Sequence, residues 1–366
     1  MKHISIIIPL GHTSLVNIEG THQIFSNVNE ILKEVGKSPL FDVRLVGLTK
    51  KTEQSTGLFV VKPDLLIHEV NKTDIIIIPA IHGDQYTAAE NNKDFIPWLI
   101  NQYNEGAEIA SFCLGSFFLA ATGLLDGKQA TTHWRFANEF RLMFPQINLL
   151  DDKIMTEENG IYTSGGAYSY LNLILYLVEK HAGRDIAILT AKSFMIDLNK
   201  YSQSPFIMFR GQKEHDDEPI RKAQEFIENN FQEKITVGQL ASMFALSRRN
   251  FERRFKKATA NTISEYIQRV KVEAAKMNLE SSSENISEIM YKVGYNDNKA
   301  FRSTFKKITG LTPVEYRNKY NQFAVAPQPL FNYLYKKTRF DVFIWDHARI
   351  SLSEPFVTII SNKIIQ

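Results

Sequence analysis

One cysteine and one histidine have the types and the spacing of a reactive pair. Cys113 is the only cysteine among 366 residues; it follows the apolar run Glu108–Phe112 and precedes Gly115. This order predicts a buried strand, a residue at a sharp turn and then a helix, which is the form of a nucleophile elbow. A helix N-terminus favours a thiolate, and His133, twenty residues on, is a possible base. The alternative is that both are core residues, Cys113 as a small apolar side chain and His133 as a hydrogen-bonding one.

A second group of residues recurs at a spacing of 50 positions. Eight residues within a 16-residue window reappear: Phe251, Phe255, Lys256, Lys257, Thr259, Thr262, Glu265 and Tyr266 return as Phe301, Phe305, Lys306, Lys307, Thr309, Thr312, Glu315 and Tyr316. Agreement of this extent predicts two copies of one structural unit.

Each copy has the pattern of a helix, a tight turn and a second helix. Apolar stripes at helical spacing are Val237, Leu240, Ala241 and Phe244 in the first copy, and Ile286, Ile289, Met290 and Val293 in the second. We expect turns at Ala245-Leu246 and at Gly294. The second helices should be capped by Ser247 and Asp297.

The second helix of each copy carries many hydrogen-bond donors on its outer face. The residues predicted to face outward are Arg248, Arg249, Asn250, Arg253, Arg254, Lys256 and Lys257 in the first copy, and Asn298, Lys299, Arg302, Ser303, Lys306 and Lys307 in the second. Such side chains suit phosphates and base edges in a major groove. A helix from Thr262 to about Leu279 would be roughly 25–28 Å long and could hold two recognition helices about one DNA turn, ~34 Å, apart. The alternative is a purely structural helical bundle.

The residues before these copies alternate between strand and helix patterns. Short β-branched runs are Ile4–Leu10, Val43–Leu48, Asp74–Pro79 and Glu108–Phe112, and apolar residues at helical spacing lie between them, as in Ile24, Val28, Ile31, Leu32 and Val35. Helices are also predicted at Leu171–His181 and Asp185–Asp197. The pattern indicates an α/β fold with a flavodoxin-like parallel sheet sandwiched by helices, followed by an all-α domain with two helix-turn-helix motifs.

Composition divides the chain into four segments. We predict an α/β domain over 1–198, an exposed linker over 199–219, a helical domain over 220–320 and a tail over 321–366 to which no role is assigned. The net charge of +3 hides an asymmetry, since residues 1–233 have 21 Lys and Arg against 29 Asp and Glu, a net −8, and residues 234–320 have 17 against 8, a net +9. A basic segment of this kind points to a polyanionic partner.

The helical segment resembles the AraC/XylS-type DNA-binding domain along its whole length. The second copy carries the resemblance, through Ile289–Tyr295, Phe301, Phe305, Gly310, Thr312-Pro313 and Tyr316-Arg317. Carried over by position, the residues expected to face bases are Arg249, Glu252 and Arg253 in one half-site and Asn298, Lys299, Arg302 and Ser303 in the other. Met290 stands where the family usually has Ala, and Ala260 where it usually has Gly.

Residues 3–198 resemble the PfpI-like branch of the class I glutamine amidotransferase-like superfamily. The resemblance rests on Cys113–Phe117, Gly123–Gly127 and Ala130–Trp134. A PfpI-like domain followed by an AraC-type domain is the architecture of GlxA-type transcriptional regulators, which implies a sensor of small nitrogenous metabolites. The pocket implied by the resemblance is lined by Asn17, His82, Gly83, Cys113, Leu114 and His133.

Three departures from the superfamily pattern bear on chemistry. Asn17 stands where the enzymes place an acid that shares a proton with the elbow cysteine, Ala80–Gly83 replaces the usual Gly-Gly segment, and Asn172 replaces a common Asp. These changes favour a site that binds a ligand without converting it to a product. They also suggest a ligand less cationic than a quaternary amine.

The sequence therefore predicts a ligand-responsive transcription regulator that is not an enzyme and needs neither a cofactor nor a metal. We expect double-stranded promoter DNA and a small-molecule effector as partners, with RNA polymerase as a further candidate, and a homodimer in the cytoplasm without membrane association. Two alternatives remain open. One is a cysteine-dependent amidase or deglycase fused to a DNA-binding module, and the other is a redox switch at Cys113.

Overall fold

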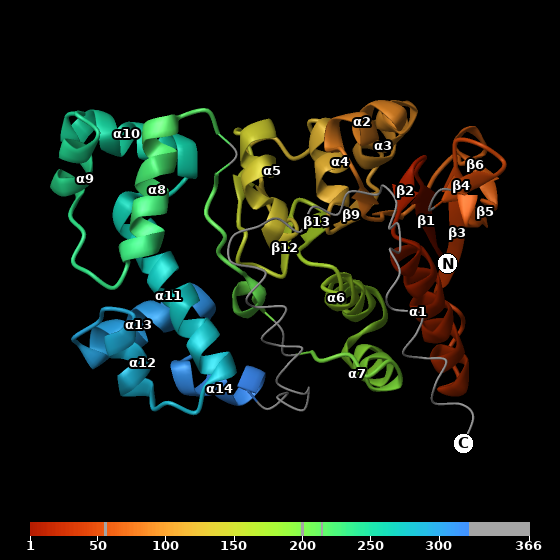
Figure 1. The fold of residues 1–366 in the computed structure, drawn as a ribbon. Helices are drawn as coiled ribbons and strands as arrows, with labels where there is room; N and C mark the ends of the chain where they lie inside the picture. The colour runs from red at the N-terminus through yellow and green to blue at the C-terminus, as the bar shows by residue number, and fades with distance from the viewer. Residues whose placement is uncertain (55–56, 199–200, 214, 322–366) are drawn as a thin grey trace, which may run out of the picture. The chain divides into compact units, whose positions relative to one another are not determined.

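A seven-stranded sheet forms the centre of the first domain. The structure is a computed structural model that describes residues 1–54, 57–198, 201–213 and 215–321 (Figure 1). The sheet order is β12-β13-β9-β7-β1-β3-β6. Its strands are β1 (Lys2–Ile8), β3 (Phe41–Gly47), β6 (Leu65–Leu66), β7 (Ile75–Ile78), β9 (Glu108–Phe112), β12 (Met155–Glu158) and β13 (Ile161–Ser164). All neighbours are parallel except β12 and β13. The predicted α/β fold is confirmed, with one antiparallel strand at the sheet edge.

Helices cover both faces of this sheet, as Figure 1 shows. On one face lie α1 (Leu15–Glu34), α6 (Tyr170–Ala182) and α7 (Arg184–Ser193), and on the other α2 (Gln85–Asn91), α3 (Ile96–Asn104), α4 (Gly115–Ala121) and α5 (Ala137–Met143). The all-apolar strand β7 shows why the sheet is sandwiched. Its residues Ile75 and Ile77 belong to the core on the α1 side, while Ile76 and Ile78 belong to the core on the α4 side.

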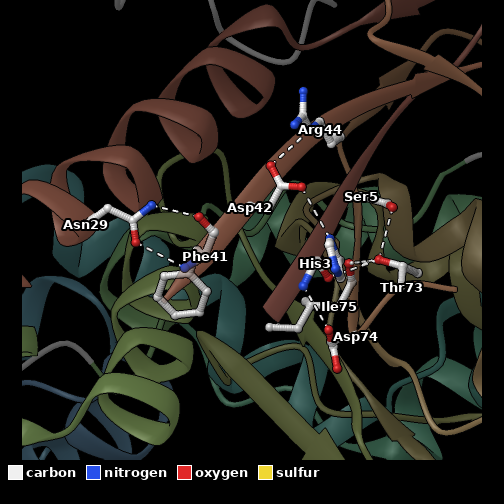
Figure 2. A network of polar contacts seen from close by, with 9 residues as sticks. All are labelled: His3, Ser5, Asn29, Phe41, Asp42, Arg44, Thr73, Asp74 and Ile75. Carbon is white, nitrogen blue, oxygen red and sulfur yellow. Dashed lines mark hydrogen bonds and ion pairs between the residues drawn. The ribbon is translucent and has the colours of Figure 1, made fainter. Parts of the chain in front are cut away.

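Polar side chains hold the amino-terminal edge of the sheet together (Figure 2). On α1, Asn29 donates to the Phe41 carbonyl oxygen at 2.7 Å and accepts from the Phe41 N–H at 3.0 Å, which fixes the start of β3. The Asp74 carboxylate accepts from the His3 N–H at 2.7 Å, and the Thr73 hydroxyl accepts from Ser5 at 3.0 Å. The carboxyl ends of these strands lie at the opposite edge of the sheet.

Short two-stranded ribbons surround the sheet. They pair β2 (His12–Thr13) with β8 (Ile81–His82), β4 (Thr52–Gln54) with β5 (Phe59–Val61), and β10 (Gln129–Ala130) with β11 (Asn148–Leu149). The β2–β8 pair joins the segment after β1 to the segment after β7. It therefore fixes two of the loops at the carboxyl-terminal edge.

The second domain is helical, as predicted. Its helices are α8 (Glu218–Asn230), α9 (Val237–Met243), α10 (Arg248–Thr259), α11 (Ile263–Ser281), α12 (Ile286–Lys292), α13 (Asn298–Thr309) and α14 (Pro313–Tyr320). It has two apolar cores, one around Phe251 and Phe255 and the other around Phe301 and Phe305. The two cores match the two copies of the repeat.

The prediction of an exposed linker over residues 199–219 is wrong in part. Gln203 is 3% exposed and Ser204 is 8% exposed, and Ser204–Phe206 form the short helix η5. The helix α8 already begins at Glu218, capped by Asp217. Polar composition suggested exposure, but the Gln203 amide is buried because backbone groups satisfy its hydrogen bonds. The predicted tail lies outside the described residues from 322 onward.

Candidate ligand pocket and DNA-binding surface

Cys113 lies at a strained turn between β9 and α4. Its φ is +53°, a left-handed conformation that is uncommon for a residue with a Cβ. The Cys113 N–H donates to the Ser164 carbonyl at 3.0 Å, and the Cys113 carbonyl accepts from the Ser116 hydroxyl at 2.9 Å. A Cβ at Gly115 would lie 2.6 Å from the Pro79 carbonyl oxygen, so only glycine fits there. The predicted elbow geometry is confirmed.

Burial opposes a thiolate at this elbow. Burial raises the pKa of the Cys113 thiol to about 12, and the side chain is 3% exposed. Desolvation of a charged sulfur in an apolar core is the largest cause of this rise in pKa. Burial and the helix N-terminus therefore act in opposite directions on this thiol, and a role of Cys113 as a nucleophile stays a hypothesis.

A cavity of about 180 Å³ opens beside the Cys113 turn. Its lining residues are Ser14, Val16, Asn17, Ala80, His82, Cys113, Ala167 and Tyr168. They follow strands β1, β7, β9 and β13, whose carboxyl ends meet at one edge of the parallel sheet. The lining contains no carboxylate and no permanently charged side chain.

Three of the six predicted pocket residues line this cavity. Asn17 is 2% exposed and accepts from the Ala80 N–H at 3.1 Å, and His82 and Cys113 lie with it. The other three, Gly83, Leu114 and His133, are not among the lining residues. Ser14, Val16, Ala167 and Tyr168 were not predicted because no motif marks them, and Ala80 was named only as part of the Ala80–Gly83 segment. Ala167 and Tyr168 follow β13, a strand that was not predicted from the sequence.

Burial lowers the pKa of two histidines near the pocket, which favours their neutral forms. Burial lowers the pKa of His133 to about 4, with further contributions from the nearby Arg135 and His82 charges. Burial also lowers the pKa of His82, as does the neighbouring His12, whose ring centroid is 5.1 Å away. The His133 Nδ1 accepts from the Arg135 N–H at 3.1 Å, and the hydrogen bonds of the described residues include none between His133 and the Cys113 thiol. The pair does not have the contacts of a nucleophile and its base.

The second helix of each helix-turn-helix copy is capped as predicted. The Ser247 hydroxyl accepts from the Asn250 N–H, and the Asp297 carboxylate accepts from the Ala300 N–H. The turns differ between the copies. Ala245 and Ala260 have φ of +51° and +55°, where the second copy has Gly294 and Gly310 at +74°.

The predicted DNA-binding residues lie on the outer faces of α10 and α13. All are exposed except the half-buried Asn250: Arg248, Arg249, Glu252 and Arg253 on α10, and Asn298, Lys299, Arg302 and Ser303 on α13. The inward Phe251, Phe255, Phe301 and Phe305 are fully buried. The amphipathic division of both helices is therefore as the repeat predicted.

Several polar side chains of α10 have partners within the protein. Arg248 pairs with Glu252 at 3.1 Å, and Arg253 donates to Asn250 at 3.1 Å. Arg254 was predicted to face outward, but it is half-buried and donates two hydrogen bonds to Asp217, at 2.9 and 2.6 Å. The prediction for Arg254 is wrong because a carboxylate at the start of α8 lies within its reach.

The helix α11 joins the two copies, as predicted. It has 19 residues, which corresponds to about 28 Å at ~1.5 Å per residue. Met290 is 2% exposed within the second core, so the larger side chain is accommodated there. No helix of the described residues is both long and apolar enough to cross a membrane, and these residues contain no group of three potential metal ligands.

Fold and site define a helix-turn-helix protein with an additional α/β domain. A model of the DJ-1/PfpI family matches residues 28–180, and a model described as a helix-turn-helix domain matches residues 240–319. The chain is thus a DJ-1/PfpI domain fused to an AraC-type helix-turn-helix domain.

Several characterised proteins are similar to this chain. It is 26% identical over 214 residues to the HTH-type transcriptional regulator ArgR of Pseudomonas aeruginosa. This match covers 58% of this chain and 65% of ArgR. It is 24% identical over 215 residues to the HTH-type transcriptional regulator GlxA of Rhizobium meliloti, and this match covers 58% of this chain and 66% of GlxA. It is 31% identical over 155 residues to isonitrile hydratase of Pseudomonas putida, and this match covers 42% of this chain and 62% of the hydratase. The matched part thus spans no more than about two thirds of these relatives.

Proposed function

We propose that this protein is a transcription regulator that binds promoter DNA through α10 and α13. The exposed donor-rich faces on two capped helices, joined by α11, carry the proposal. Arginine and asparagine side chains can read guanine and adenine edges, and the lysines can contact phosphates. The similarity to regulators such as ArgR and GlxA supports it. RNA polymerase and a second copy of the chain remain expected partners.

Genomic footprinting with the full chain tests DNA binding. We expect recovery of discrete sites, and loss of most of that recovery when Arg302 is replaced by alanine. The matched control is Lys222→Ala, which removes an exposed cation on α8 that pairs with Glu218. Equal recovery by the wild type and Arg302→Ala, or loss with Lys222→Ala, would contradict the proposal.

We propose further that the cavity beside Cys113 binds a small, polar and formally uncharged effector. The lining has no carboxylate to balance a cation, and the pKa of His82 is lowered by burial and by His12. Asn17 and Ser14 offer hydrogen-bonding groups, and the volume of about 180 Å³ suits a molecule of few heavy atoms. Small amides and related nitrogenous metabolites have this chemistry.

A thermal-shift screen of the full chain tests the effector site. A small neutral amide should raise the unfolding temperature, and Asn17→Ala should abolish the shift. Asn104→Ala, at an exposed position on α3, is the control and should leave the shift unchanged. A shift that survives Asn17→Ala places the effector elsewhere.

The enzyme alternative has one observation in its favour, the similarity to isonitrile hydratase. The geometry favours it less, since the pKa of Cys113 is raised by burial and Asn17 cannot share a proton as an acid does. Cys113→Ser separates the two functions, because an enzyme should lose turnover whereas a sensor should change only in effector affinity. The redox alternative predicts a promoter response to peroxide that Cys113→Ser removes.

A further inference from the structure

Residues 201–213, here called the strap, begin in contact with the α/β domain through Gln203. The side-chain oxygen of Gln203 accepts from the Gly166 N–H at 3.0 Å. Its nitrogen donates to the carbonyl oxygens of Thr132, at 3.0 Å, and Lys153, at 3.1 Å. With 3% exposure, the amide is buried and its polar groups are satisfied. Such a contact is costly to break without replacement partners.

The Gln203 amide supports one wall of the candidate ligand pocket. A Cβ at Gly165 would lie 2.7 Å from both polar atoms of the amide, so the glycine leaves room for it. Gly166 is held by the hydrogen bond to Gln203, and the next two residues, Ala167 and Tyr168, line the cavity. The backbone that shapes this wall therefore depends on a residue of the strap.

The strap continues directly onto the helices of the DNA-binding domain. The Tyr320 hydroxyl donates to the Pro205 carbonyl at 3.0 Å, and the Lys276 ammonium donates to the Ile207 carbonyl at 2.6 Å. Lys276 has a side-chain exposure of only 4% and also pairs with Glu273 at 2.8 Å. Loss of the Ile207 carbonyl would leave a buried ammonium with one partner fewer, which is unfavourable.

Further contacts extend the strap along α11 and α8. The Phe209 N–H donates to Glu273 at 3.1 Å, and the Phe209 ring packs edge-on to Tyr266 with centroids 5.0 Å apart. Lys213 pairs with Glu228 at 2.7 Å. The strap is therefore bound by specific contacts at intervals from Gln203 to Lys213, while Tyr201 before them and Met208 between them are exposed.

We propose that Gln203 is a positioning residue that couples the pocket wall to the DNA-binding helices through the strap. Only Ser204 separates Gln203 from Pro205, so the chain has little slack between the two sets of contacts. A ligand that displaces the Gly166–Tyr168 backbone would change the Gln203 contacts and, through them, the seating of the strap on α11. This coupling rests on the proposed function of the pocket and of the helices.

Hydrogen exchange of the full chain, without DNA or effector, tests the coupling. Gln203→Met keeps the side-chain length and removes the amide. We expect exchange at least ~5-fold faster at Gly166 and also at Phe209, whose acceptor belongs to α11. The control is Gln146→Met, which removes an exposed amide that donates to Asp126. Faster exchange at Gly166 with no change at Phe209 would overturn the proposal.

The reciprocal variant starts from the other domain. Lys276→Met removes the donor to Ile207 and should speed exchange at Gly166, because a coupling between two sites acts in both directions. No effect at Gly166 would also overturn the proposal. Binding of a fluorescein-labelled 30-bp duplex by the wild type tests the proposed DNA-binding function separately, so its failure would leave the exchange result interpretable.

Discussion

At Cys113, backbone conformation and burial act in opposite directions on reactivity. The turn places the residue after a strand and before a helix, where a nucleophile would be placed, and strains its φ to +53°. Burial then raises the pKa of its thiol to about 12. The elbow could be predicted from Glu108–Gly115, because strand, turn and helix are local patterns. The protonation state could not be predicted, since it depends on residues that the fold brings beside Cys113 from α1 and from the segments after β7 and β13.

Alkylation of Cys113 by iodoacetamide should therefore be slow in the folded protein. With its pKa raised to about 12, the thiol gives a thiolate fraction at pH 7.5 that is lower by a factor on the order of 10³ than that of an unperturbed thiol. We expect labelling to be at least ~100-fold slower than in the guanidinium-unfolded chain, with both rates measured by mass spectrometry. Comparable rates in the two states would show that the thiol is accessible and ionised, as the enzyme and redox alternatives require.

Between the two helix-turn-helix copies, the same element is built with different turn residues. In the first copy Ala260 ends α10 with φ of +55°, and in the second Gly310 ends α13 with φ of +74°. Repetition at 50 positions predicted both helices and their caps, because caps and apolar stripes are local. It did not predict the Arg254–Asp217 pair, since those residues are 37 positions apart and belong to elements whose packing no local pattern records.

Replacing Ala260 by glycine should stabilise the helical domain. A left-handed conformation costs a residue with a Cβ about 1–2 kcal/mol, which exceeds the entropic cost of glycine in the unfolded chain. We expect a gain of about 0.5–1 kcal/mol in the free energy of unfolding, measured by calorimetry of the full chain. Gly310→Ala is the matched reverse change and should destabilise by a similar amount. A loss of stability with Ala260→Gly would mean that its Cβ contributes packing that outweighs the strain.

Asp217 should contribute stability both as a helix cap and as the partner of Arg254. Asp217→Ala removes both roles and should lower the free energy of unfolding by about 1–2 kcal/mol. Asp217→Asn keeps the cap and should lower it by about 0.5 kcal/mol. The hydrogen bond from Arg254 is the largest cause that lowers the pKa of Asp217 in the folded state. Its ionic contribution is therefore present above the unfolded pKa of about 3.9 and is lost as the pH falls through the lower folded value.

Urea unfolding at pH 7 and at pH 3 separates the two roles of Asp217. The difference in the free energy of unfolding between the wild type and Asp217→Asn should be smaller at pH 3 than at pH 7. The difference between Asp217→Asn and Asp217→Ala should be the same at both pH values. Equal costs for the two variants at pH 7 would assign the whole effect to the ion pair.

At the scale of the whole molecule, two parts of the chain have net charges of opposite sign. Residues 1–233 have a net charge of −8, with 21 basic and 29 acidic residues, and residues 234–320 have +9, with 17 and 8. This division could be predicted from counts alone. The strap could not, because its Ser, Gln and Gly residues have the composition of an exposed linker. Burial of Gln203 depends on backbone groups of Thr132, Lys153 and Gly166, which only the folded domain brings together.

The basic surface should make DNA binding steeply dependent on salt, and two variants should divide that dependence. Lys307→Ala removes a proposed phosphate contact, so it should weaken binding to every duplex alike and lower the slope of log affinity against log salt by about 1. Arg302→Ala should instead cost about 1–3 kcal/mol on a footprinted site and much less on a scrambled duplex, because a base contact carries sequence information. Fluorescence anisotropy between 50 and 200 mM salt measures both quantities. If Arg302→Ala lowers affinity equally on both duplexes and also lowers the slope, Arg302 contacts phosphate, and the second half-site must be read through Asn298 and Lys299 instead.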